Sequence, residues 1–184
     1  MKARTPKARR SLRLGGVGMV IVALAGCGGI SANEAAIIDG ESIGESELQE
    51  TTAQLNSIST EAASPSMVLG ELTRTPFLDN VMAGTPAALT DQQVSELLRE
   101  NGLAEPSDLT IDVARTRQYL AVLQDPEVLA DPEMSEALNK LQTITAPDIE
   151  AIVDEINPRY GTFDANPEVL TVVPSAPEWI APAG

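Results

Sequence analysis

The side chains that usually carry out catalysis are scarce in this chain of 184 residues. It contains no histidine and one cysteine, Cys27, and a single lysine, Lys140, follows that cysteine. Ser-His-Asp and Cys-His catalysis and histidine-ligated zinc are therefore excluded. A Ser-Lys pair would need Lys140, and no Ser-x-x-Lys spacing leads to it. What remains is the thiol of Cys27 and the chemistry of carboxylates.

Carboxylate chemistry takes two forms that the sequence allows us to weigh. Glycosidases need only two acidic side chains at the right separation, but they usually line sugar subsites with aromatic rings, and this chain has two Phe, two Tyr and one Trp. Asp-Pro-Glu at 125–127 and again at 131–133 suggests calcium, but neither copy has the alternating oxygen ligands and glycine of a calcium loop. We therefore expect no catalytic residues, no metal site and no cofactor.

The segment before Cys27 has the order of a secretory signal. Six basic residues precede an uncharged apolar run over 14–25, which is shorter than the roughly 20 residues that span a bilayer and has the length of a signal-peptide core. Leu24-Ala25-Gly26-Cys27 then resembles the lipobox of bacterial lipoproteins. The resemblance implies a signal peptide over 1–26, cleavage after Gly26, and acyl chains such as palmitate on Cys27. The alternative is an ordinary signal peptide with an incidental cysteine.

A lipidated Cys27 would place the mature protein on the extracytoplasmic face of the cell membrane, because two acyl chains anchor stably. All 27 acidic residues and only six basic ones follow Cys27, so the mature chain is more acidic than the whole-chain net charge of −15 indicates. This balance excludes nucleic acid as a partner, since phosphate binding needs clustered Lys and Arg. A hydrophobic content of 43% is enough for one packed domain, and no second cysteine is available for a disulfide.

The first elements of the mature chain are predicted from local signals. Residues 27–34 are small and polar and form the expected lipidated tether. The apolar run Ala35–Ile38 precedes Asp39-Gly40, a pair typical of tight turns, so we expect a short strand and a second one after the turn. Ser46 and Gln49 have the spacing of a capping box and predict a helix over 47–59.

Capping and periodicity predict a series of further helices. One begins near residue 66, and Pro76 leaves open whether it is one kinked helix or two abutting ones. Thr90 and Gln93 form a second capping box, whose helix Asn101-Gly102 closes. The longest helix starts at Pro106-Ser107 and buries one apolar stripe. The residues of that stripe are Leu109, Val113, Thr116, Tyr119, Leu120, Val122 and Leu123.

The late segments carry mixed signals. The two Asp-Pro-Glu copies predict a one-turn element and then a helix over 132–141, because Asp, Pro and Glu are each preferred at helix starts. Ile149, Ile152, Val153 and Ile156 recur at helical spacing, but their β-branched side chains also suit a strand. Residues 165–184 are rich in proline and read as a tail.

Asn157-Pro158-Arg159-Tyr160-Gly161 resembles the carboxy-terminal strand of the SurA-type and PrsA-type extracytoplasmic foldases, and residues 36–48 resemble the opening of their amino-terminal chaperone domain. The resemblance covers roughly 35–164. It implies a mostly α fold, a helical cluster with a small β pairing between about 35–43 and about 153–157, in which residues 157–161 have a structural role. On this basis we predict a strand at Val153–Asn157 against Ala35–Ile38.

The same resemblance shapes the functional expectation. Foldases of this type usually carry a histidine-dependent parvulin isomerase domain, and between Leu141 and Asn157 there is no room for one. We therefore expect a non-catalytic, membrane-anchored chaperone-like module that binds secreted or unfolded polypeptides, with Met67, Met82 and Met134 either in a client groove or in the core. The alternatives are an envelope scaffold lipoprotein that binds one folded partner, and a degenerate carboxylate enzyme.

Overall fold

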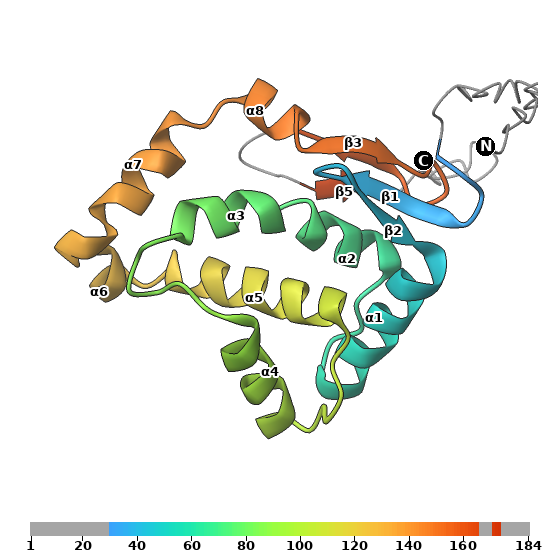
Figure 1. Ribbon diagram of the computed structural model, residues 1–184, viewed down its shortest axis with the longest axis horizontal. Helices are drawn as coiled ribbons and strands as arrows, with labels where there is room; N and C mark the ends of the chain where they lie inside the picture. Colours follow the sequence, from blue (N-terminus) through green and yellow to red (C-terminus); the bar gives the residue numbers. More distant parts are fainter. Residues whose placement is uncertain (1–29, 166–170, 174–184) are drawn as a thin grey trace, which may run out of the picture.

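The computed structural model describes residues 30–165 and 171–173. Over these residues the chain is mostly helical, with a small antiparallel sheet on one side of the helices (Figure 1). Among the described helices, none has the length and apolar character needed to cross a bilayer. The predicted signal peptide over 1–26, including Leu24, Ala25 and Gly26, lies outside the described residues, as does Cys27.

The sheet joins the beginning of the described chain to its late part. Strands β1 (Glu34–Ile38), β2 (Glu41–Gly44) and β3 (Val153–Ile156) are arranged in the order β2-β1-β3, all antiparallel. Asp39 and Gly40 form the tight turn of the β1–β2 hairpin with φ angles of 51° and 76°. The predicted hairpin and the predicted pairing of β3 with β1 are both confirmed.

The ambiguous segment around residues 149–156 contains both a helix and a strand. Helix α8 (Ala146–Glu150) includes Ile149, which is 3% exposed, and β3 begins three residues after the helix ends. In the sheet, Ile37 lies opposite Glu155 and Ala36 opposite Ile156. Strand pairing with β1 therefore overrides the helical spacing of the isoleucines.

Helix α1 (Glu45–Ile58) begins two residues earlier than expected. Its N-cap is Gly44, whose backbone N–H donates to a carboxylate oxygen of Glu47 at 2.8 Å. The predicted capping box of Ser46 and Gln49 is therefore wrong. The helix starts directly at the end of β2, so the cap is set by where the strand stops rather than by the first local serine.

Pro76 separates two helices rather than kinking one. Helix α2 (Pro65–Leu72) is capped by Ser64, and α3 (Thr75–Met82) carries Pro76 in its first turn, where a missing N–H is tolerated. Helix α4 (Asp91–Glu100) begins with the predicted capping box, in which Thr90 and Gln93 bond each other's backbone N–H groups.

Helix α5 (Asp108–Val122) lies at the centre of the helical cluster and packs against α1, α2, α3 and α4 (Figure 1). Its predicted start at Ser107 is confirmed, because the Ser107 hydroxyl accepts from the Thr110 N–H. The predicted apolar stripe is too narrow. Since neighbours cover several faces of α5, Ile111, Ala114 and even Arg115 are also buried.

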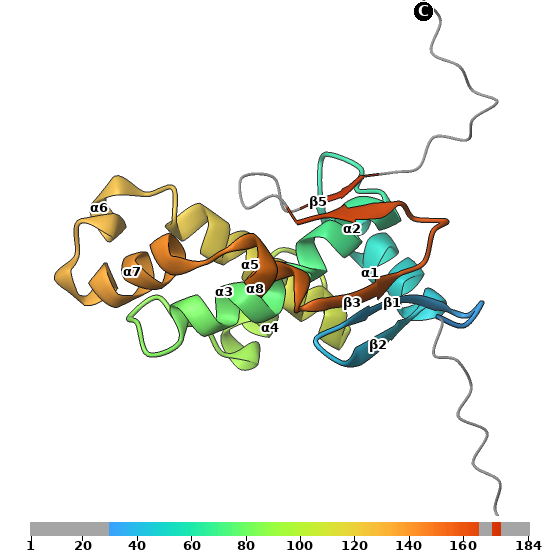
Figure 2. The same ribbon diagram turned by 90° about the horizontal axis from the view of Figure 1, so that it is seen from above.

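Two short elements follow α5 at the end of the molecule opposite the sheet (Figure 2). Asp125 caps α6 (Pro126–Leu129) and Asp131 caps a 3-10 turn (Pro132–Met134), each by accepting from the N–H two residues on. Helix α7 (Ser135–Thr143) comes next, so the predicted helix over 132–141 starts as a 3-10 turn and runs slightly longer. The Asp-Pro-Glu copies are helix starts.

A second, two-stranded sheet extends the fold beyond its predicted end. Strand β4 (Thr162–Asp164) pairs with β5 (Thr171–Val173), and Val172 is buried in the same core cluster as β1. The predicted tail of residues 165–184 thus includes a packed strand. The predicted tether over 27–34 also ends earlier, because Glu34 already belongs to β1.

Candidate functional site

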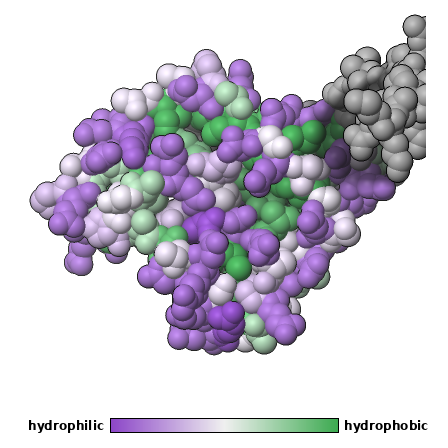
Figure 3. Space-filling model, viewed as in Figure 1, coloured by the Kyte–Doolittle hydropathy of each residue, from purple (hydrophilic) through white to green (hydrophobic). Residues whose placement is uncertain are grey.

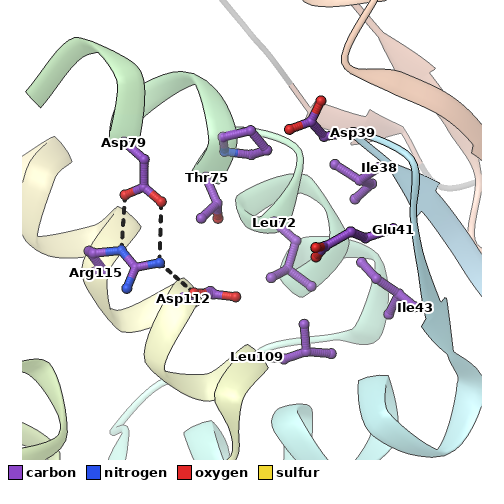
Figure 4. A pocket seen from close by; sticks show the side chains of 11 residues that line it. Ile38, Asp39, Glu41, Ile43, Leu72, Thr75, Asp79, Leu109, Asp112 and Arg115 are labelled. Carbon is purple, nitrogen blue, oxygen red and sulfur yellow. Dashed lines mark hydrogen bonds and ion pairs between the residues drawn. The ribbon is translucent and has the colours of Figure 1, made fainter. Parts of the chain in front are cut away.

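A cavity of about 290 Å³ opens where the β1–β2 hairpin meets helices α2, α3 and α5 (Figure 4). We call it the hairpin pocket. Its apolar lining comes from Ile38, Ile43, Leu72, Pro76 and Leu109. Its polar lining comes from Asp39, Glu41, Thr75, Asp79, Asp112 and Arg115. Ile38, Ile43 and Leu72 are almost completely buried, so the pocket has a fixed hydrophobic floor beneath an acidic rim.

Two carboxylates of the hairpin have no partner within the described part of the chain. Asp39, at the turn, and Glu41, at the start of β2, are exposed, and no hydrogen bond or ion pair involves their side chains among the described residues. Figure 4 shows the Glu41 carboxylate directed over Leu72 toward the side of the pocket that Asp112 of α5 occupies. Acidic groups from two distant segments therefore face one hydrophobic floor.

Arg115 lies on the opposite wall and is the buried cation of an ion-pair cluster. Its Nε donates to Asp79 Oδ1 at 2.9 Å and its Nη2 to Asp79 Oδ2 at 3.2 Å, which is a bidentate pair with α3. The guanidinium also bonds Asp91 at the start of α4 and Asp112 one turn earlier on α5. Arg115 is only 8% exposed, so one buried cation holds three helices together through three carboxylates.

The charges in this cluster are not balanced, and the pKa values reflect it. Burial raises the pKa of Asp112 above its ordinary value, and the neighbouring Asp79 and Asp91 charges add to this, although Arg115 opposes it. Burial lowers the pKa of Arg115, but its hydrogen bond to Asp79 and the surrounding carboxylates outweigh that effect and raise it overall. Each nitrogen of the Arg115 guanidinium donates to at least one of these three carboxylates.

The motif over residues 157–161 follows β3 and joins the late part of the chain to β1 and to the starts of α1 and α2. The Asn157 N–H donates to the Ala35 carbonyl at 2.9 Å, and its side-chain amide donates to the Glu34 carbonyl at 2.8 Å. After Pro158, Arg159 pairs with Glu45 at 2.6 Å. Buried Tyr160 accepts from Ser66 through its carbonyl, and Gly161 has a φ angle of 133°. These contacts position strands; they do not line the hairpin pocket.

The methionines do not form a client groove. Met82 and Met134 are 0% and 1% exposed and pack in one core cluster, whereas Met67 on α2 is 57% exposed. The alternative of core packing therefore holds for two of the three. Across the described residues, no group of three or more His, Cys, Asp or Glu side chains is arranged to hold a metal ion.

The sequence pattern missed the hairpin pocket. The sequence places Asp39 in a turn and Glu41 in the strand after it, with no sign that they line a pocket. Asp112 and Arg115 are polar residues that flank the apolar stripe of the longest predicted helix. The spacing of Asp112 and Arg115, three apart on one helix face, was the one available signal of an ion pair. Comparison of the chain with family models, with curated proteins and with solved structures finds no match.

Proposed function

We propose that this chain is a membrane-anchored, extracytoplasmic lipoprotein whose helical domain binds secreted or unfolded polypeptides without catalysing a reaction. The anchor is Cys27, in the lipobox Leu24-Ala25-Gly26-Cys27 at the end of a signal-like segment. The domain is a SurA-type chaperone module that lacks the isomerase.

The observation that carries the proposal is the pairing of β3 with β1. A late strand that returns to the opening strand, with helices between them, is the arrangement that resemblance to the SurA-type and PrsA-type foldases implies. Asn157 supports it further, because its side chain and backbone both bond the first strand. A chaperone module of this type closes on itself in this way.

The connection before β3 supports the absence of an isomerase. Helix α7 ends at Thr143, α8 occupies Ala146–Glu150, and β3 begins at Val153. The Asp39 N–H already donates to the Ile152 carbonyl, so the chain is fixed to the hairpin immediately after α8. An isomerase domain between the helices and the last strand would have to replace this short link.

Aggregation suppression tests the binding function. The full chain, extracted in non-ionic detergent, should slow the aggregation of several unrelated unfolded proteins at sub-stoichiometric to equimolar ratios, and prolyl-isomerase turnover should stay at background. A Cys27→Ser variant should leave the membrane fraction and keep the same suppression, which separates anchoring from binding. Lack of effect on every client would contradict the chaperone proposal, and membrane retention of the variant would contradict the lipid anchor.

A scaffold lipoprotein that binds one folded partner is the second candidate, and one observation favours it. The described surface exposes few large hydrophobic side chains, namely Met67 and Val173. Hydrophilic residues cover most of the face in Figure 3, with hydrophobic residues gathered right of centre, where α2 and the hairpin lie in the same view. Crosslinking in the native envelope should then recover one dominant partner rather than many.

A further inference from the structure

We propose that the hairpin pocket binds a basic side chain, lysine or arginine, of an extended polypeptide segment whose neighbouring residues are aliphatic. The inference rests on the proposed function, because it names the feature of the polypeptide that this domain recognises. It assigns a specific site and a specific chemistry to a binding activity that the fold alone leaves general.

The shape and lining of the pocket favour a long side chain with an apolar stem. The floor is formed by Ile43 from β2, Leu72 from α2 and Leu109 from α5, while the acidic groups stand at the rim (Figure 4). Lysine and arginine bury their methylene stems along apolar surface and keep the charged head among polar groups. A cavity of about 290 Å³ lies at the low end of the range for small-molecule sites and suits one or two side chains.

The charge of the pocket selects a cation. Arg115 is committed to Asp79, Asp91 and Asp112, which outnumber it. Glu41 and Asp39 add two further carboxylates without a partner in the described chain. An ammonium or guanidinium group entering over Leu72 would meet Glu41 on one side and the excess negative charge of the Arg115 cluster on the other.

An organic cation fits this arrangement better than a metal ion does. The acidic side chains that line the pocket are spread around its rim, and nowhere in the described residues do three of them converge as a metal site requires. The hydrophobic floor would also remain uncovered by a bare ion, whereas an aliphatic stem would cover it. Neighbouring aliphatic residues of the same segment can extend that contact along Ile38 and Pro76.

Peptide binding tests the inference with the full chain in non-ionic detergent. The probe is a short capped peptide with one lysine between two aliphatic residues, and the comparison peptide has norleucine in place of lysine. Binding measured by calorimetry should be about tenfold weaker for the norleucine peptide, since a charge-assisted hydrogen bond contributes on that order. Raising the salt concentration should weaken only the lysine peptide.

Two matched variants locate the effect. Asp39→Asn with Glu41→Gln removes the two unpartnered rim charges, and Glu61→Gln with Glu100→Gln removes two exposed charges elsewhere. The rim variant should bind the lysine peptide about tenfold more weakly and the norleucine peptide unchanged, and the distant variant should match the wild type. Circular dichroism and the urea midpoint of each variant establish that it is folded.

The outcomes separate the inference from the function on which it rests. Equal binding of lysine and norleucine peptides, or equal loss in the rim and distant variants, overturns the pocket assignment and leaves polypeptide binding intact. Binding of spermidine as tightly as the lysine peptide overturns it in favour of a small-cation site. Failure of every peptide to bind, together with no suppression of aggregation, overturns the proposed function itself.

Discussion

Asn157 and Glu34 are joined by a hydrogen bond that connects the end of β3 to the start of β1: the Asn157 side-chain amide donates to the Glu34 carbonyl oxygen at 2.8 Å. The side-chain oxygen of Asn157, Oδ1, accepts a hydrogen bond from the Arg159 backbone N–H at 3.2 Å. Asn157 is 9% exposed, so water cannot replace these bonds without opening the sheet.

Replacing Asn157 by alanine should lower the free energy of unfolding by about 2 kcal/mol, because two part-buried hydrogen bonds, one to the Glu34 carbonyl and one from the Arg159 N–H, are lost. Urea denaturation followed by circular dichroism measures the change. Asn139→Ala on the exposed face of α7 is the control, with an expected change within about 0.5 kcal/mol. Equal effects of the two substitutions would show that the strand contact adds nothing to stability.

Arg115→Met should be among the most destabilising single substitutions, because it leaves Asp79 and Asp112 half-buried without their cation. Breaking a buried ion pair costs about 3–5 kcal/mol. The carboxylates are partly exposed, so we expect a loss near about 3 kcal/mol in a denaturant titration. Adding Asp79→Asn to the Arg115→Met variant should restore part of the lost stability, because one of the unpaired carboxylates is removed. Arg99→Met on α4 serves as the control, since within the described part of the chain the Arg99 side chain bonds only the Ala104 carbonyl.

The raised pKa of Asp112 predicts a specific dependence of stability on pH. The folded protein holds this proton more tightly than the unfolded chain does, so stability contributed by Asp112 rises as the pH falls through the raised pKa toward the ordinary value of about 3.9. Asp112→Asn removes the titration. The free energy of unfolding of the variant should therefore exceed that of the wild type most near neutral pH, and this excess should shrink as the solution is acidified.

The difference between variant and wild type is the quantity to measure, since other groups titrate in the same range. The charged groups that shift the pKa of Asp112 are Arg115 on its own helix, Asp79 on α3 and Asp91 on α4, and Glu41 lies across the same pocket. Hydrogen bonds from Ser31 lower the pKa of Glu34, and hydrogen bonds from Thr145 lower the pKa of Asp148. The contributions of these two groups to stability have the opposite sign and cancel in the difference. If Asp112→Asn instead loses more stability at neutral pH than in acid, the ion pair of Asp112 with Arg115 contributes more than the burial of the Asp112 charge costs.

Gly40→Ala should lower the free energy of unfolding by about 1–2 kcal/mol through backbone strain alone. Gly40 has a φ angle of 76°, and an added Cβ would meet no atom within 4 Å, so no steric clash contributes. Asp39→Asn is the matched control, because asparagine tolerates the left-handed conformation that Asp39 adopts at 51°. Thermal unfolding should show a lower midpoint for Gly40→Ala and an unchanged one for the control.

Elements whose signal lies within a few residues were predictable from the sequence. The Asp39-Gly40 turn needs only two residues that accept positive φ, and the Thr90–Gln93 capping box only two side chains one turn apart. The start of α1 was placed wrongly because Gly44 carries no side chain that a capping pattern could recognise. Local chemistry predicts a cap well only when a side chain performs it.

Features that depend on distant segments were less accessible. Arg115 is buried because three carboxylates from three helices neutralise it, and no pattern within α5 indicates that burial. The hairpin pocket likewise combines residues of the first two strands with residues of α2, α3 and α5. Strand β3 was predicted against its own periodicity only because a family resemblance supplied its partner β1.

The central place of β1 has a consequence for the timing of folding. Its partner β2 follows after one turn, but Gly40 meets the Asp154 side chain across 114 positions of sequence. A chain made from its amino terminus therefore completes the hairpin early and leaves one edge of β1 bare until nearly the whole domain has emerged. Bare strand edges pair readily with other chains. Slow closure of this long loop would thus set the interval during which a newly made chain is vulnerable to proteolysis and aggregation.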